Sequence, residues 1–175
     1  MNNYMSFIIF VMSVVAIAVV VAIVRKVSKR MESRYDERQR AIRGAGFKYG
    51  FTVIVLLNLI YGLFLYELMK EFINYQEATI AIVFIGCAVT EVYCIFNDAY
   101  VQVGQKIKSW IMLCIIVIVA NVFAAIGNYE LVKEGEKDGF SLFLNVAVSL
   151  LFAVILGSVA AKCLMNRRSD KYEES

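Results

Sequence analysis

The chain contains no proline and no histidine, and it is poor in charge. Because proline is absent, no helix can carry a kink or hinge imposed by a pyrrolidine ring. Because histidine is absent, imidazole-based acid–base catalysis, metal ligation and pH sensing are all excluded. Charged residues make up 19% of the sequence, against roughly 25% in ordinary soluble domains.

The sequence contains four cysteines, and their spacing predicts neither a disulfide framework nor a metal site. Cys87, Cys94, Cys114 and Cys163 all fall within or at the end of apolar runs, and no C-x-x-C spacing occurs. Cys87 and Cys94 share a helix face with Glu91, but a fourth ligand for a soft metal is not evident. We therefore read the cysteines as small apolar side chains and predict no metal and no cofactor.

Hydrophobic residues are abundant, at 61% of the 175 residues, which favours a bilayer over water as the solvent. Five continuous apolar runs, each long enough to cross a membrane as a helix, are separated by short polar gaps. β-barrel strands would be about ten residues long with alternating polarity, so helices are favoured. The sequence predicts an all-α integral membrane bundle in a single domain, residues 1–175, with five transmembrane helices. The predicted spans are 4–24, 47–69, 78–96, 110–128 and 140–163.

The distribution of basic residues predicts the orientation. With five crossings, the segment 25–46, the third gap and the tail 164–175, each taken with its flanking basic residues, lie on one side of the membrane. They hold fifteen of the eighteen lysines and arginines. By the positive-inside rule this side is cytoplasmic, which places the N-terminus outside and the C-terminus inside.

The basic segment 25–46 has two interpretations. We expect it to form a helix that continues from the first span or lies on the membrane. Its basic side chains would orient the protein and contact anionic lipid heads. The alternative is a docking surface for a protein partner. Acidic residues suggest it, because the basic residues of the segment would orient the protein in the membrane without them. Its candidate residues are Asp36, Glu37, Arg38 and Gln39, to which the loop residues Asp98 and Tyr100 are added.

Two segments carry a resemblance. YDERQ at 35–39, followed by IRG at 42–44 and FKY at 47–49, resembles a motif of uncharacterised small multi-pass membrane proteins of Gram-positive bacteria. VYCIFNDAY at 92–100 resembles a second segment of those proteins, where a tyrosine-rich helix end runs into an Asp-Ala-Tyr loop. The resemblance implies a bacterial cytoplasmic-membrane location and no assigned activity. It also hints at a regulatory pairing, because many such proteins are thought to sit beside small transcriptional regulators.

A few polar residues interrupt the predicted spans. Glu91 lies near the cytoplasmic end of the third span. Its carboxyl group either bonds to a partner on another helix or reaches the membrane interface, or it belongs to a polar interior site linked to protons or cations. Asn58, Asn121 and Asn145 lie in the second, fourth and fifth spans. We favour hydrogen bonds between helices for these amides. The alternative is a polar path shared with Glu91.

Small residues repeat every fourth position along the fifth span, after Asn145: Ser149, Ala153, Gly157 and Ala161. Such a stripe lets another helix backbone approach closely, and Gly46 and Gly50 make a shorter version in the second span. Packing within the chain is the first interpretation, and a homo-oligomer seam is the alternative.

Motifs of catalysis are missing: there is no Gly-rich phosphate loop, nucleophile elbow or zinc-ligand spacing. An enzyme is therefore the least favoured class, and the basic patch lacks the context of a nucleic-acid interface. The sequence favours a non-enzymatic interaction, sensing or regulatory subunit acting through its cytoplasmic face. The alternative is a small transporter, channel or immunity-type protein with a polar path through Glu91.

Overall fold

The structure is a computed structural model that describes residues 21–23, 26, 35–101, 107–135 and 139–173. Long helices dominate this part of the chain, and no strand occurs in it. The elements are α2 (Glu37–Ile60), a π-helical turn η1 (Tyr61–Leu65), α3 (Tyr66–Met69), α4 (Tyr75–Phe96), α5 (Ile107–Lys133) and α6 (Phe140–Glu173). The expectation of an all-α chain is confirmed for the described residues.

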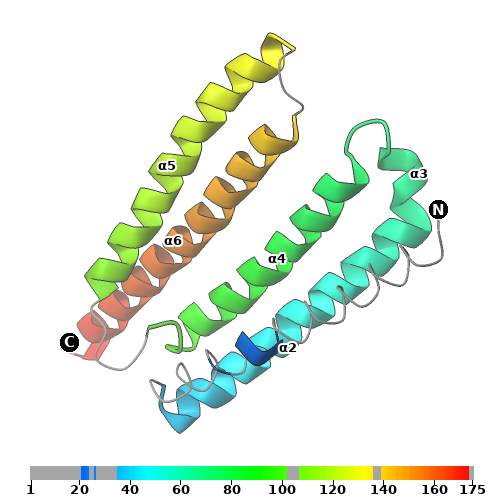
Figure 1. Ribbon diagram of the computed structural model, residues 1–175. Helices are drawn as coiled ribbons and strands as arrows, with labels where there is room; N and C mark the ends of the chain where they lie inside the picture. Colours follow the sequence, from blue (N-terminus) through cyan, green and yellow to red (C-terminus); the bar gives the residue numbers. More distant parts are fainter. Residues whose placement is uncertain (1–20, 24–25, 27–34, 102–106, 136–138, 174–175) are drawn as a thin grey trace.

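The long helices stand side by side in the order α2, α4, α6, α5 (Figure 1). Helix α4 packs against α2 on one side and α6 on the other, and α5 packs against α6. Successive long helices run in opposite directions, as expected of a chain that crosses a layer repeatedly (Figure 1). The turn between α3 and α4 ends where Glu77 accepts a hydrogen bond from the Asn74 N–H at 3.0 Å, which caps α4.

Four helices among the described residues are long and apolar enough to cross a membrane: Glu37–Met69, Tyr75–Phe96, Trp110–Lys133 and Phe140–Asn166. They match the second to fifth predicted spans, whereas the first predicted span lies almost wholly outside the described residues. The outward side chains are strongly apolar; Leu63 and Phe123, for example, are each 72% exposed, which suits lipid rather than water.

The helices extend beyond the apolar runs, which corrects the expected form of the segment 25–46. Asp36 has an extended backbone, and its carboxylate accepts the N–H of Gln39 at 2.6 Å, so α2 begins at Glu37. The second half of the basic segment is thus the first part of α2, continuous with the second span rather than with the first. The last helix likewise continues ten residues beyond its predicted end at 163, to Glu173.

Glycines allow α2 and α4 to pack closely. Ala78, Ile82, Gly86, Thr90 and Cys94 recur every fourth residue on α4 and are all buried. A Cβ added at Gly50 of α2 would lie 2.1 Å from Thr90 Oγ1 and 2.6 Å from the Gly86 carbonyl oxygen. The prediction of close packing at Gly46 and Gly50 is confirmed at both residues, because a Cβ at Gly46 would lie 3.1 Å from Cys94 Sγ.

The helix pair α2 and α4 contacts the helix pair α5 and α6 through hydrophobic side chains. Ile95 of α4, Cys114 of α5, and Ile155 and Val159 of α6 form one buried cluster. A second cluster joins α4 to the π-helical turn through Tyr61, Ala78 and Ile82. The first cluster lies toward the end of the helices at which α4 finishes, and it supports the loop that follows α4.

Candidate functional site

The candidate site lies where α4 ends and α2 begins. Helix α4 closes with the pair of hydrogen bonds of a Schellman motif: Ala99 N–H donates to the Cys94 carbonyl at 2.8 Å, and Asp98 N–H donates to the Ile95 carbonyl at 3.2 Å. Asp98 occupies the left-handed position with φ 58°, where glycine is usual and aspartate is tolerated. The loop 97–101 therefore leaves α4 in a defined direction.

Helix α2 holds this loop through two side chains one turn apart. Gln39 Nε2 donates to the carbonyl oxygens of Asp98 and Val101, at 3.2 and 3.3 Å. Arg43 donates to the Ala99 carbonyl at 3.2 Å, and its guanidinium lies 4.5 Å above the ring of Tyr35. The first motif, 35–39, and the second motif, 92–100, are thus bound to each other.

Helix α6 reaches the same loop from the other side. Lys162 Nζ lies 3.1 Å from an Asp98 carboxylate oxygen and donates to the Phe96 carbonyl oxygen at 2.8 Å. The Lys162 side chain is 17% exposed, while that of Asp98 is 54% exposed. The loop is consequently tied to α2 and to α6, which contact α4 on different sides.

Tyr100 anchors the loop against α5. Its ring packs edge-on against Trp110, with centroids 5.7 Å apart. Burial raises the pKa of Tyr100 above its ordinary value of 10.0, and the neighbouring Cys163 and Asp98 act in the same direction. The loop thus connects to all four long helices, since α2, α4, α5 and α6 each contribute a contact.

The structure divides the six predicted interaction residues into two groups. Asp36 caps α2, Gln39 and Tyr100 are half-buried in contacts within the chain, and Asp98 is ion-paired. Glu37 and Arg38 are exposed. Neither side chain has a hydrogen bond or ion pair among the described residues, so these two are available to a partner.

Sequence reasoning did not assign Arg43 and Lys162 to this site. Lys162 was counted only as a basic residue that orients the chain, and Arg43 was counted in the same way and as part of the IRG motif at 42–44. For Arg43 the available signal was its position four residues after Gln39, which places both on one helix face. For Lys162 it was a single lysine at the end of an apolar run, where a charge needs a partner or a route to water.

The predicted polar path finds little support in the hydrogen bonds. Asn58, Asn121 and Asn145 each donate to the carbonyl four residues earlier in their own helix, at 2.8 to 2.9 Å. Bonds from these amides to other helices, which we expected, are not seen in the described part of the chain. The Thr90 hydroxyl lies within hydrogen-bond distance of two carbonyl oxygens, that of Gly86 in its own helix at 3.0 Å and that of Gly46 on α2 at 3.3 Å, and its single proton can be donated to either.

The small-residue stripe of α6 is not closely packed. A Cβ at Gly157 would have no atom within 4 Å, and Ala153 is exposed. Ser149 and Ala153 instead line an open apolar hollow of about 510 Å³ beside α5. The predicted close approach is therefore not made at Gly157 by the described residues, and the homo-oligomer seam stays a prediction.

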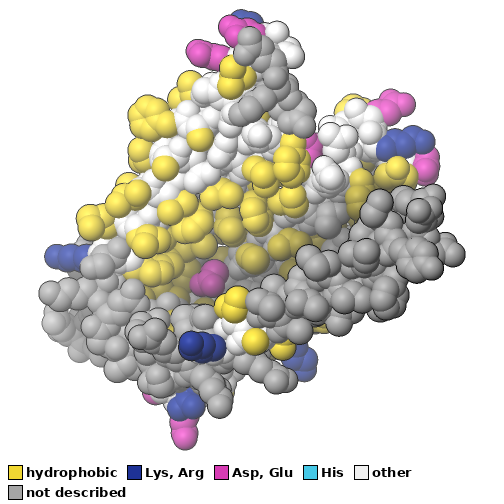
Figure 2. Space-filling view, viewed as in Figure 1, with side chains coloured by type: hydrophobic (Ala, Val, Ile, Leu, Met, Phe, Trp, Pro, Cys, Tyr) yellow, Lys and Arg dark blue, Asp and Glu magenta, His cyan; other side chains and the backbone are white. Residues whose placement is uncertain are grey.

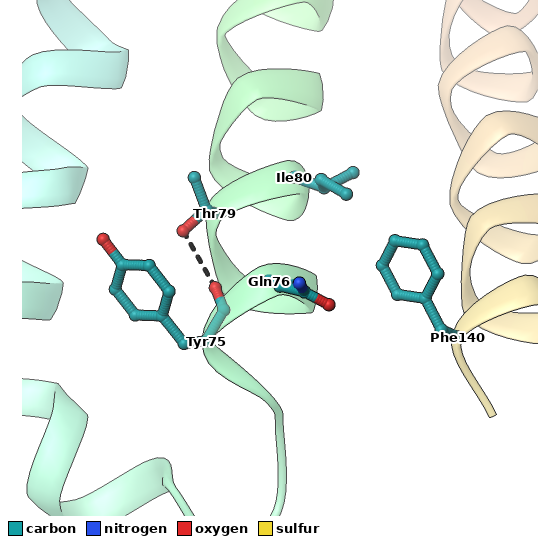
Figure 3. A pocket seen from close by; sticks show the side chains of 5 residues that line it. All are labelled: Tyr75, Gln76, Thr79, Ile80 and Phe140. Carbon is teal, nitrogen blue, oxygen red and sulfur yellow. Dashed lines mark hydrogen bonds between the residues drawn. The ribbon is translucent and has the colours of Figure 1, made fainter. Parts of the chain in front are cut away.

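A hollow at the opposite end of the row contains none of the predicted site residues. It measures about 360 Å³ and is lined by Tyr75, Gln76, Thr79, Ile80 and Phe140 (Figure 3). Gln76 and Ile80 point toward Phe140, while the ring of Tyr75 lies on the other side of α4 and the Thr79 hydroxyl donates to Tyr75 O at 2.8 Å (Figure 3). The side chains around this hollow offer no charge and no metal-binding group.

Within the described residues, no group of three or more histidine, cysteine, aspartate or glutamate side chains is placed to hold a metal ion. Comparisons of the chain with models of protein families, with curated proteins and with solved structures found no match. No family is therefore identified. The candidate spans show a multi-pass membrane protein whose helices contact the lipid bilayer, and whose helix ends meet in one hydrogen-bonded cluster.

Proposed function

We propose that this chain is a non-enzymatic interaction, sensing or regulatory subunit of the bacterial cytoplasmic membrane, and that it acts through its cytoplasmic face. The positive-inside rule assigns the start of α2, the loop 97–101 and the end of α6 to the cytoplasm. These three segments meet at one end of the molecule through Gln39, Asp98 and Lys162. Exposed basic residues nearby would contact anionic lipid heads: Lys26, Arg38, Arg40, Lys48 and Lys108.

The observation that carries the proposal is that neighbouring side chains on the first turn of α2 point in different directions. Gln39 turns inward and fixes the loop, so the neighbouring Glu37 and Arg38 project from a backbone that is held in place. Charged side chains on a fixed backbone lose less conformational freedom when a partner binds than the same side chains on a loose segment. This end of the molecule therefore suits recognition of a protein with complementary charges.

Co-purification in a mild detergent tests the proposal. The E37A/R38A variant removes one acid and one base and leaves the Asp36 cap and the Gln39 clamp intact. The matched control is E67A/K70A, which removes an acid and a base from the opposite end of the molecule. We expect the partner to be lost with the first variant and retained with the second. Failure to recover any partner, or equal recovery with both variants, would count against this function.

The transport alternative has weaker support and is ranked second. Asn58 on α2 and Asn121 on α5 belong to helices at opposite ends of the row (Figure 1), and their amides bond within their own helices. Proton flux into proteoliposomes carrying wild type or E91Q is its test. Flux that E91Q abolishes would favour a path through Glu91 over the interaction function, and vesicles as tight as empty ones would exclude it.

A further inference from the structure

The four long helices form a row, and one face of α4 contains a half-buried acid, Glu91, that lies away from the stripe packed against α2. The buried stripe that includes Gly86 and Thr90 packs against α2, and Ile95 packs with residues of α6. Glu91 follows Gly86 by five residues, which places it about 140° around the helix from that stripe. Cys87, one turn before Glu91, lies on the same face and is exposed.

The carboxylate of Glu91 has no hydrogen bond and no ion pair among the described residues. Figure 2 shows an acidic side chain among hydrophobic ones in the hollow between the two helix pairs. A carboxylate turned toward lipid is unfavourable by roughly 2.5–3.5 kcal/mol at the bilayer centre, and by less at the position of Glu91, which lies five residues before the end of α4. A protein neighbour on this face of α4 would remove the carboxylate from lipid.

The chain contains one segment of suitable length and polarity. The apolar run 4–24 would extend about 32 Å as a helix, as long as a bilayer core is thick. Twelve residues, 25–36, connect it to α2, and extended they span at most about 40 Å. Helix α2 begins at the end of the row where α4 finishes, since Gln39 contacts Asp98. The run can therefore enter the membrane beside α4.

Residues 21–23, the part of this run that the structure describes, support a position of the run on this side of the row. Residues 21–23 are helical and exposed, and Figure 1 draws them in front of α2, on the viewer's side. Figure 2, in the same view, shows a hydrophobic surface with an acidic side chain in the hollow on that side. If the run crosses parallel to α4, counting from the ends of both helices brings Ala18 near the depth of Glu91, where its small side chain would leave room for a carboxylate on a facing helix.

We propose that residues 4–24 cross the membrane along the Glu91 face of α4 and close the row of four helices into a bundle. Glu91 then faces protein instead of lipid. The opposite face of α4, which contains Ile85 and Val89 beside an apolar groove toward α6, stays open to lipid. The inference does not depend on the interaction function, because it concerns packing inside the membrane.

Disulfide cross-linking in native membranes tests this packing with a cysteine that the chain already has. Cys94, Cys114 and Cys163 are replaced by alanine, and Cys87 is kept. Single cysteines are then introduced at one turn of the run at the depth of Cys87: V14C, V15C, A16C and I17C. The matched control carries I85C with Cys87→Ala, because Ile85 lies at similar depth about 200° around α4 and is 47% exposed.

We expect an intramolecular product between Cys87 and one or two neighbouring positions of the run, and none in the I85C background. Membrane insertion of every variant is checked before oxidation, and the V14C–I17C set covers all faces of the run. Cross-linking in the I85C background instead, or at no position in either background, would overturn the proposal. A dimer-sized product would also overturn it, because the run would then pack against a second copy.

Discussion

The side-chain amide of Gln39 donates to the backbone carbonyl of Asp98, 59 positions further along the chain, at 3.2 Å. This bond joins the start of one membrane helix to the end of the next. The same amide also reaches Val101, so a single side chain fixes two points of the loop. The other hydrogen-bonding atom of the side chain, Gln39 Oε1, is buried and has no hydrogen-bond partner among the described residues.

Replacing Gln39 with alanine is expected to loosen the loop 97–101. Two hydrogen bonds, each contributing about 0.5–1.5 kcal/mol, are lost, and two backbone carbonyls lose a donor. We expect a lower melting temperature of the detergent-solubilised protein and faster proteolysis at the loop. The neighbouring exposed residue supplies the control, since Arg40→Ala should leave both measurements unchanged. Equal stability of the two variants would show that the clamp does not contribute.

The sequence alone identified the two segments of this site but not their contact. Charge counting placed 25–46, the third gap and the tail on one side, and in the structure residues of the first two meet each other and Lys162, which precedes the tail. The partners within that end were not predictable, because they depend on the left-handed backbone of Asp98 and the direction in which it turns the loop. Arg43 and Lys162 were therefore counted as charges and not recognised as hydrogen-bond donors.

The apolar runs predicted the four described spans but not the helix ends. Hydropathy reports where side chains meet lipid, whereas a helix continues until its backbone hydrogen bonds are capped. This is why α2 begins at Glu37, ten residues before its apolar run, and α6 reaches Glu173. The asparagine amides were misjudged for a related reason: composition cannot distinguish a bond to another helix from one to the carbonyl four residues earlier.

Replacing Gly50 with alanine is expected to push α2 and α4 apart. The new Cβ would lie 2.1 Å from Thr90 Oγ1 and 2.6 Å from the Gly86 carbonyl oxygen, and that backbone atom cannot rotate away. Overpacking of this kind destabilises by about 1–3 kcal/mol, and we expect a corresponding fall in thermal stability in detergent.

The same substitution in α6 provides the comparison. Gly157→Ala places a Cβ where no atom lies within 4 Å. Alanine is about 1 kcal/mol more favourable than glycine inside a helix, so the melting temperature should stay constant or rise. A large loss of stability with Gly157→Ala would mean that the stripe packs against something outside the described contacts, such as a second copy.

Substitutions of Asp98 should rank by their tolerance of a positive φ. At φ 58° glycine is unstrained and asparagine is tolerated, whereas alanine in the left-handed region is disfavoured by roughly 1–2 kcal/mol. All three substitutions remove the partially exposed ion pair with Lys162, which contributes at most about 1 kcal/mol. We expect thermal stability to follow Gly above Asn above Ala. If alanine equals asparagine, the Schellman turn does not set the loop's conformation.

Stability is expected to fall in alkaline solution partly because of Tyr100. Burial raises the pKa of its phenol, so the folded protein keeps the proton at a pH where the unfolded chain, with an ordinary pKa of 10.0, has begun to lose it. Its contribution is thus fully present below pH 10.0 and is lost as the pH rises toward the higher folded pKa. Melting temperatures of wild type and Tyr100→Phe, compared across this range, isolate the effect from the other tyrosines. Above pH 10.0 the melting temperature of Tyr100→Phe should rise relative to that of the wild type. Parallel curves would show that Tyr100 titrates alike in the folded and unfolded protein.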